Sequence, residues 1–211
     1  DAGHVKRLLA VMRTDTTPIH GVFHLAAIVE DVLVADASED NYRHLLQPKM
    51  AGAWNLYRGL RGNDLDFWVS FSSIATVVNQ PGQGSYAAAN AFLDSLARYA
   101  TARGDRMHSL QWGPWAGTGL ANTAGTQRSF QAYAAQGIQP MPPAFGMTIL
   151  DRAMTCAAPV LLAAAIDWRV FEGAYAGQPG VMEFSCVAPA ETAASVVPGE
   201  TAAVSPSIHG A

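Results

Sequence analysis

Three polar side chains at short spacing mark the middle of the chain as a candidate ligand site. Ser73 follows a run of apolar residues, Tyr86 comes thirteen residues later, and Asn90 comes four residues after Tyr86. Residues four apart share one face of a helix. Ligands of parallel sheets bind at the carboxyl ends of strands, where Ser73 is predicted to lie, and a phenol and an alcohol there can donate hydrogen bonds. Taken separately, such a serine also occurs as a loop hydrogen-bonding residue and such a tyrosine as a packing residue.

A lysine interrupts an apolar row on a predicted long helix. The row at helical spacing consists of Tyr42, Leu46, Lys49, Ala53, Leu56 and Leu60. Burying an ammonium group is costly unless the group is paired or has a task, which makes Lys49 a second candidate for chemistry. The alternative is a lysine at the edge of the apolar face that extends its charged end to solvent.

The elements that would position these residues alternate between helix and strand. Helices are predicted over residues 1–13, 38–60 and 86–103, and strands over residues 19–26, 65–71, 107–112 and 160–166. Ser38 can cap the second helix, Glu39 and Asp40 suit its first turn, and Gly104 can end the third helix. This alternation predicts an α/β fold with a doubly wound, mainly parallel sheet covered by helices on both faces.

A long excursion separates the last two predicted strands. Residues 113–155 are rich in glycine and proline, with helical patterns near residues 129–136 and 144–154. Excursions of this length from α/β domains commonly form lids or binding loops, so we predict a helical lid. After Phe171 the composition changes to Ala, Pro, Ser, Gly and Val. We therefore divide the chain into a domain at residues 1–173 and an Ala/Pro-rich linker or tail at residues 174–211.

Composition excludes several classes of protein. Half of the 211 residues are apolar and 14% are charged, which is the composition of a globular domain. The net charge of −4 and the lack of a basic cluster argue against nucleic-acid binding, and the longest apolar run, residues 156–166, is too short to span a membrane. The histidines are scattered and Cys156 and Cys186 form no CxxC pair, so we assign no metal and expect reduced cysteines in a cytoplasmic protein.

An ordered set of motifs identifies a family. The run FSSIATVVNQPGQGSYAAANAFLDSLA, followed by WGPW, closely resembles the ketoreductase domains of modular polyketide synthases, which belong to the short-chain dehydrogenase/reductase superfamily. The motifs HLAAIVED, PKMAGAWNL, DFWVSFSS and AAIDWRVF support the resemblance, which covers about residues 1–172. It implies a Rossmann-like fold and an NADPH-dependent reduction. The implied substrate is a β-ketoacyl thioester on an acyl carrier protein, reduced to the β-hydroxyacyl form during polyketide or lipid chain extension.

The resemblance also implies catalytic roles. Most of the superfamily places a catalytic lysine four residues after the tyrosine, where this chain has Asn90, whereas the synthase ketoreductases exchange lysine and asparagine in sequence. Lys49, 24 residues before Ser73, is then the active lysine. Tyr86 would donate its proton to the substrate oxygen and Ser73 a hydrogen bond. Lys49 would lower the pKa of Tyr86, and Asn90 would hold Lys49 in place.

Further residues are assigned by resemblance to cofactor binding and to stereocontrol. The expected cofactor-binding residues are His24, Ala26, Ala27, Ser72, Pro114 and Trp115. Asp31, Pro81 and Gln83 are expected to contact the substrate and control stereochemistry. Val29–Asp31 aligns with the Leu-Asp-Asp signature of the B-type class, whereas the tryptophan of the A-type class would fall at Val78. A B-type alcohol, of D configuration, is therefore expected.

One part of the family pattern has no counterpart in this sequence. A Gly-rich turn between a strand and a helix should bind the cofactor's phosphates, and the glycines at 82–84 and 117–119 do not stand in that context. We expect that turn, the first strands of the sheet and the rest of the ketoreductase to lie upstream of Asp1. Other synthase domains are expected partners. The alternatives are a non-catalytic scaffold fragment of a megasynthase and a free-standing short-chain dehydrogenase.

The missing phosphate-binding turn generates a prediction about the isolated chain. A polypeptide of residues 1–211 alone should bind NADPH poorly and reduce little or no substrate, because the donors for the pyrophosphate are absent. A fluorescence titration with NADPH measures the affinity, and a dissociation constant in the micromolar range would contradict the prediction.

Overall fold

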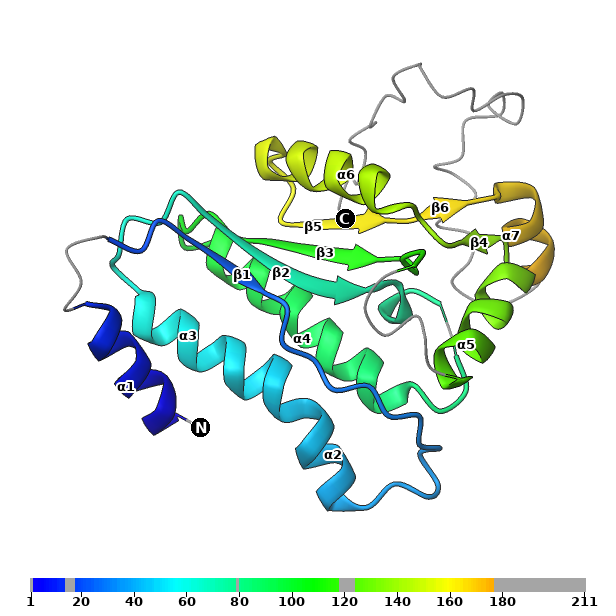
Figure 1. Ribbon diagram of the computed structural model, residues 1–211, viewed down its shortest axis with the longest axis horizontal. Helices are drawn as coiled ribbons and strands as arrows, with labels where there is room; N and C mark the ends of the chain where they lie inside the picture. The colour runs from blue at the N-terminus through cyan, green and yellow to red at the C-terminus, as the bar shows by residue number, and fades with distance from the viewer. Residues whose placement is uncertain (1, 14–17, 79, 118–123, 177–211) are drawn as a thin grey trace.

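The computed structural model describes residues 2–13, 18–78, 80–117 and 124–176, with the backbone alone for residues 124–128. Within these residues a parallel sheet is formed by β1 (Gly21–His24), β2 (Phe67–Ser73), β3 (His108–Trp112) and β5 (Val160–Ala163), in that order. One face is covered by α3 (Ala53–Leu60) and α4 (Gly84–Thr101), with α1 (Ala2–Met12) packed against α3, and α6 (Pro143–Thr155) covers the other (Figure 1). The predicted α/β fold, a partial Rossmann-like sheet covered on both faces, is confirmed.

Alternate residues of the strands build a separate core on each face of the sheet. Trp68 of β2 packs with helices α1, α3 and α4, whereas the adjacent Val69 packs with α6. Phe71 of β2 is paired with Leu110 of β3, and both pack on the face toward α6. Because successive residues of a strand point to opposite faces, the residues on either side of Leu110 face α4. A third cluster, at the carboxyl end of the sheet, includes Tyr133 and Phe171.

The predicted helix over residues 38–60 is continuous but not uniform. It consists of α2 (Glu39–Leu46), a π-helical segment at Gln47–Gly52, and α3. Ser38 caps α2 as predicted, and Asn41 completes a reciprocal capping box with it. Pro48 explains the wider turns, because proline has no N–H for the helical ladder and its ring crowds the preceding carbonyl group. The segment places the buried Lys49 toward the sheet.

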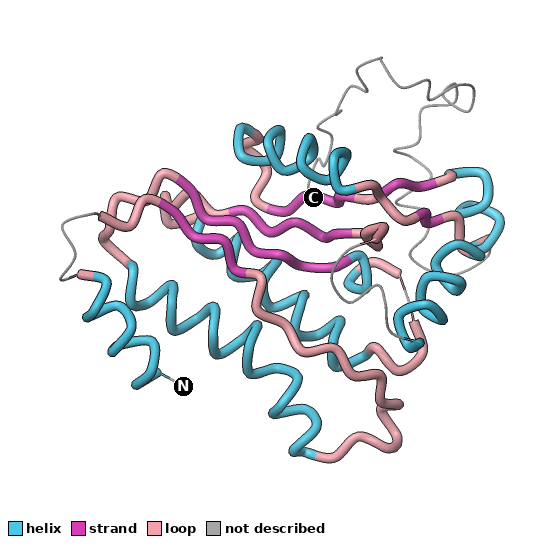
Figure 2. The backbone as a smooth tube through the Cα atoms, viewed as in Figure 1, coloured by secondary structure: helices cyan, strands magenta, loops and turns pink. Residues whose placement is uncertain are grey.

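The excursion and the last predicted strand differ from expectation. Residues 160–166 do not form one strand, because β3 ends at Trp112 and offers no partner beyond Ala163. Instead β6 (Ala165–Ile166) pairs antiparallel with β4 (Ile138–Gln139) of the excursion. The two helices predicted in the excursion are present as α5 (Ala124–Ala135) and α6. Figure 2 shows α5 beyond the carboxyl ends of the strands.

The last helix extends beyond the predicted start of the tail. Asp167 caps α7 (Trp168–Tyr175) by accepting hydrogen bonds from the Arg169 and Val170 N–H groups. Tyr175 is buried and donates a hydrogen bond to Gln136 Oε1 at 2.6 Å, so residues 174 and 175 continue the folded domain. The rest of the predicted tail, from residue 177, lies outside the described residues.

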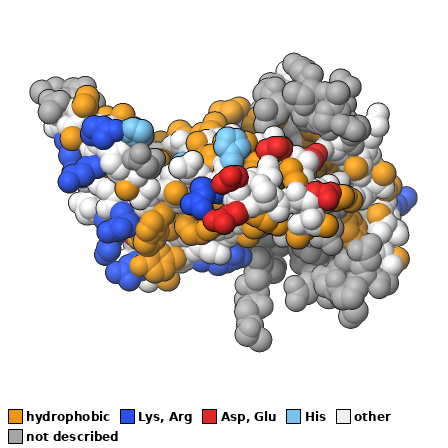
Figure 3. Space-filling model, turned by 90° about the horizontal axis from the view of Figure 1, so that it is seen from below, with side chains coloured by type: hydrophobic (Ala, Val, Ile, Leu, Met, Phe, Trp, Pro, Cys, Tyr) orange, Lys and Arg blue, Asp and Glu red, His pale blue; other side chains and the backbone are white. Residues whose placement is uncertain are grey.

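The surface in Figure 3 carries no uniform charge. Acidic, basic and hydrophobic side chains are interspersed on the face shown. Across the described residues, no helix combines the length and apolarity needed to cross a membrane.

Gly137, which follows α5 in the excursion, packs against the start of α7 so closely that a side chain does not fit. Its φ is 79°, and an added Cβ would lie 2.5 Å from the Asp167 carbonyl oxygen and 2.8 Å from the Phe171 nitrogen. Both neighbours are backbone atoms, so neither can turn aside. The contact fixes the end of α5 against the start of α7.

Replacement of Gly137 should destabilise the protein more than replacement of a glycine in open space. Gly104 is the matched control, because its φ is 88° and no atom lies within 4 Å of an added Cβ. Gly104→Ala should lower the free energy of unfolding by about 1 kcal/mol through backbone strain alone. Gly137→Ala should exceed that loss by about 2 kcal/mol because of the added clash. Denaturant unfolding measures both, and equal losses would contradict the contact.

Candidate active site

Three segments bring their polar side chains together at the carboxyl end of β2. Lys49 comes from the π-helical segment, Ser73 from the end of β2, and Tyr86 and Asn90 from the first two turns of α4. The Ser73 and Asn90 side chains lie near enough to the Tyr86 hydroxyl to lower its pKa. The Lys49 Nζ lies 5.8 Å from the centroid of the Tyr86 ring. The predicted convergence of an ammonium, an alcohol and a phenol is therefore present in the structure.

Backbone contacts hold the Lys49, Ser73 and Asn90 side chains in place. Lys49 Nζ donates a hydrogen bond to the Phe71 carbonyl oxygen at 2.6 Å. Ser73 Oγ accepts from the Ala75 N–H at 3.2 Å and so caps the short 3-10 helix Ile74–Thr76. Asn90 Nδ2 donates to the Tyr86 carbonyl oxygen at 2.8 Å, one turn earlier on α4. The side chains are thus oriented by the chain itself before any ligand binds.

Burial controls the charge of Lys49 and its neighbour His24. Lys49 is only 2% exposed, and this burial lowers its pKa to about 8, against the opposing influence of Asp94. Lys49 therefore remains mostly an ammonium ion at neutral pH. Burial, with the Lys49 charge, lowers the pKa of His24 to about 4. The His24 imidazole is therefore neutral and adds no positive charge beside Lys49.

Tyr86 departs from the expectation that Lys49 lowers its pKa. Burial raises the pKa of the phenol, while the Ser73 and Asn90 side chains lower it to a smaller extent. The reason is geometric, because the Lys49 ammonium group is hydrogen-bonded to Phe71 and faces the ring. In this structure the phenol is a protonated donor.

The residues expected to bind a cofactor occupy two kinds of environment. His24 is buried at the end of β1, and its Nδ1 has no hydrogen-bond partner among the described residues. Ala26 and Ala27 follow β1 and are exposed. Ser72 faces α4, because its Oγ donates to the Asn90 carbonyl oxygen at 3.3 Å.

Pro114 and Trp115 are engaged by the excursion. The Pro114 carbonyl oxygen accepts a hydrogen bond from the Met141 N–H at 2.8 Å. The Trp115 ring packs against Trp112 and against Gly146 of α6, where an added Cβ would touch the indole. Trp115 therefore serves the packing of α6 against the sheet through its side chain.

The residues expected to control stereochemistry meet at the start of α4. Gln83 Nε2 donates to Asp31 Oδ1 at 3.3 Å, and Pro81 is exposed in the preceding turn. Tyr133 of α5, which the sequence reasoning missed, donates its hydroxyl hydrogen to Gln83 Oε1 at 3.3 Å. Tyr133 lies in the predicted lid, and that position could have marked it as a candidate site residue. Asp94 was also missed, although it lies four residues after Asn90 on α4.

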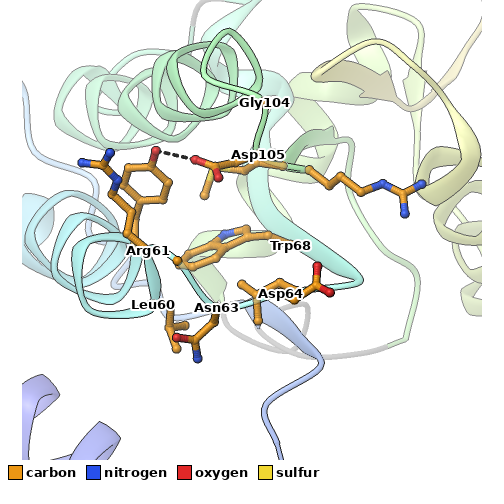
Figure 4. Close-up of a pocket in the computed structure, with 12 residues that line it drawn as sticks. Leu60, Arg61, Asn63, Asp64, Trp68, Gly104 and Asp105 are labelled. Atoms are coloured by element: carbon orange, nitrogen blue, oxygen red, sulfur yellow. Dashed lines mark hydrogen bonds between the residues drawn. The ribbon is translucent and has the colours of Figure 1, made fainter.

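A pocket at the opposite end of the sheet is separate from this site. It lies beyond the start of β2 and is lined by residues that include Arg61, Asp64 and Trp68 (Figure 4). The Tyr57 hydroxyl donates to Asp105 Oδ2 at 2.7 Å across it. None of the predicted site residues lines it. Within the described part of the chain, no cluster of three or more His, Cys, Asp or Glu side chains could hold a metal ion.

Known proteins that resemble this chain are polyketide synthases. The family model described as "KR domain" matches residues 1–117. The phenolphthiocerol synthesis polyketide synthase type I Pks15/1 of Mycobacterium bovis is 35% identical over 179 residues, which are 82% of this chain and 8% of that protein. The 6-methylsalicylic acid synthase of Aspergillus niger is 42% identical over 125 residues, which are 59% of this chain and 7% of that protein.

Solved ketoreductase structures share the fold over most of this chain. An A1-type ketoreductase has a TM-score of 0.76 at 30% identity, covering 84% of this chain and 37% of that structure. A C2-type ketoreductase from a modular polyketide synthase has a TM-score of 0.72 at 32% identity, covering 86% of this chain and 39% of that structure. The chain thus spans less than half of each structure, and the two ketoreductases are of different types. From these matches, the chain belongs to the KR family, the ketoreductase domains of polyketide synthases.

Proposed function

We propose that this chain forms the catalytic portion of an NADPH-dependent ketoreductase within a polyketide synthase. Its substrate is the β-ketone of a β-ketoacyl thioester on an acyl carrier protein, and its product is the β-hydroxyacyl thioester. The observation that carries the proposal is the convergence of Lys49, Ser73 and Tyr86 at the carboxyl end of β2. The family membership supports the reaction class.

The polar side chains suit the stabilisation of charge on a ketone oxygen. When bound, a reduced nicotinamide supplies the hydride that adds to the carbonyl carbon. Tyr86 is a protonated phenol and donates its proton to the oxygen, while the Ser73 hydroxyl donates a hydrogen bond to it. Lys49, as an ammonium ion near the Tyr86 ring, stabilises the phenolate that remains after the proton has left.

Residues near the site fit the nicotinamide end of the cofactor. His24 Nδ1 and Asn90 Oδ1 are buried and have no hydrogen-bond partner within the described residues. Buried polar atoms without partners are rare in folded proteins and commonly mark a place where a ligand or water binds. The exposed backbone at Ala26 and Ala27 offers a surface beside them.

The contact between Asp31 and Gln83 supports B-type stereochemistry. Gln83 precedes Tyr86 by three residues and donates to Asp31, so the acid of the Val29–Asp31 segment lies beside the first turn of α4. Val78 is buried at the position assigned to the A-type tryptophan. In this proposal the ketone enters past Asp31, and the product is the D alcohol.

Loss of the Tyr86 hydroxyl should abolish most of the reductase activity. In the full polypeptide that carries this chain, Tyr86→Phe should lower kcat by about 10²–10⁴-fold on a β-ketoacyl thioester, because the proton donor is gone. Tyr99→Phe is the matched control, because Tyr99 is an exposed tyrosine on the same helix. NADPH oxidation measures both rates. Equal rates for the parent and Tyr86→Phe would refute the role of Tyr86, and an inactive parent would favour a scaffold.

The configuration of the product tests the stereochemical proposal. The parent protein should yield the D-β-hydroxyacyl product, because Asp31 and Gln83 border the entry to Tyr86. Chiral chromatography of the hydrolysed product measures the ratio of enantiomers. An excess of the L alcohol would overturn the B-type proposal and leave the reduction itself in place.

A further inference from the structure

Helix α4 carries a buried carboxylate on the same face as the proposed catalytic residues. Asp94 is 4% exposed and follows Tyr86 and Asn90 at intervals of four residues. Ser109 Oγ donates to its Oδ1 at 2.6 Å, and Gln111 Nε2 donates to its Oδ2 at 2.8 Å. Both donors are neutral, so these hydrogen bonds satisfy the oxygens but leave the negative charge uncompensated.

The sheet places this charge near Lys49. The Lys49 ammonium group is bound to the carbonyl oxygen of Phe71 in β2. Phe71 is paired with Leu110 of β3, and the residues on either side of Leu110 are the two donors to Asp94. The Lys49 ammonium group is therefore bound to β2 at Phe71, and the Asp94 carboxylate of α4 is bound to β3 on either side of the residue that pairs with Phe71.

We propose that the Asp94 carboxylate keeps the Lys49 ammonium group charged beside Tyr86, and that Asp94 is thus a positioning residue for the reduction. This inference rests on the proposed function for its catalytic consequence. Its electrostatic part concerns Lys49 alone and can be measured without turnover. Nothing in the reaction requires Asp94 to touch the substrate.

The electrostatic surroundings of Lys49 support this role. Burial lowers the pKa of Lys49, and the Asp94 charge is the influence that raises it. From β1 the site faces His24, whose pKa of about 4 makes it neutral near pH 7, and from α4 it faces the protonated phenol of Tyr86. β2 contributes the neutral Phe71 carbonyl group. Among these groups, all within the described residues, Asp94 is the one whose negative charge acts on Lys49.

Two substitutions separate the charge of Asp94 from its hydrogen bonds. Asp94→Asn keeps the size of the side chain and an acceptor for Ser109 but removes the charge. Ser109→Ala removes the 2.6 Å hydrogen bond and keeps the charge. If Asp94 only ties α4 to β3, both variants should behave alike. If the charge matters, only Asp94→Asn should alter the titration of Lys49.

The titration is measured by NMR on the full polypeptide labelled with [ε-¹³C]lysine, with Lys49→Arg to assign the signal. The parent Lys49 should titrate near pH 8. Asp94→Asn should lower that midpoint by about one pH unit, whereas Ser109→Ala should leave it in place. An unchanged midpoint in Asp94→Asn, or an equal change in Ser109→Ala, would overturn the proposal.

The pH–rate profile supplies the catalytic readout. Reduction needs the ammonium form, so the alkaline limb of kcat should move to lower pH in Asp94→Asn by the same amount as the midpoint. The activity at pH 8 should then fall about fivefold, with little change at pH 6. A displaced midpoint with an unmoved alkaline limb would refute the positioning role.

Two further comparisons keep the outcome decisive. If the parent reduces no β-ketoacyl thioester, the proposed function fails, and the NMR titration alone decides whether Asp94 holds Lys49 charged. Asp94→Glu, which restores the charge on a longer side chain, should bring the midpoint back toward the parent value. Asp94→Ser replaces the asparagine variant if circular dichroism shows that the latter does not fold, and it should lower the midpoint in the same way.

Discussion

The buried ammonium group of Lys49 is the constraint around which the site is arranged. Its pKa falls from 10.5 to about 8, which corresponds to a cost on the order of 3 kcal/mol at neutral pH. The cost is fully present below pH 8, where both the folded and unfolded states are protonated, and it disappears as the pH rises toward 10.5. Three features offset this cost: the carbonyl acceptor of Phe71, the negative charge of Asp94, and a wide helical turn that directs the side chain toward the sheet. A lysine serving packing alone would have no need of such a position.

The same constraint explains why the sheet is polar where it meets α4. Strands covered on both faces are usually apolar throughout. Here β2 and β3 carry polar residues on the face toward α4, namely Ser70, Ser72, Ser109 and Gln111. Each forms a hydrogen bond in the interior, and the last two hold Asp94. Apolar packing is concentrated at the amino end, around Trp68 and Leu93, and on the face toward α6. Ser72, Ser109 and Gln111 thus place polar groups where β2 and β3 meet the helix of the candidate site.

The sequence predicted most helices and strands correctly, but it did not predict where a helix widens or a strand is divided. The row that contains Lys49 left two possibilities open, and the structure buries the lysine rather than extending it to solvent. The pattern of motifs correctly indicated a ketoreductase. The π-helical turns escaped prediction because helical spacing does not register one wider turn, although Pro48 signalled an irregularity. The strand at residues 160–166 was divided by the availability of partners, which no local pattern contains. Helix α7 was missed because the composition changes after Phe171, yet Asp167 had the type and position of a helix cap. Contacts such as that of Tyr133 with Gln83 join residues fifty positions apart and depend on the tertiary fold.

That long-range contact ties the excursion to the chemistry. Tyr133 donates to Gln83 and Gln83 donates to Asp31, so α5, the start of α4 and the segment after β1 share one directional run of hydrogen bonds. Burial raises the pKa of Tyr133, which keeps its phenol protonated and able to donate. Gln83 is the N-cap residue of α4, and Tyr86 stands in the first turn of that helix. A displacement of α5 would break the hydrogen bond from Tyr133 and leave the Gln83 side chain held by Asp31 alone. One buried amide, that of Gln83, thus connects the excursion to the start of the helix that carries the proposed proton donor.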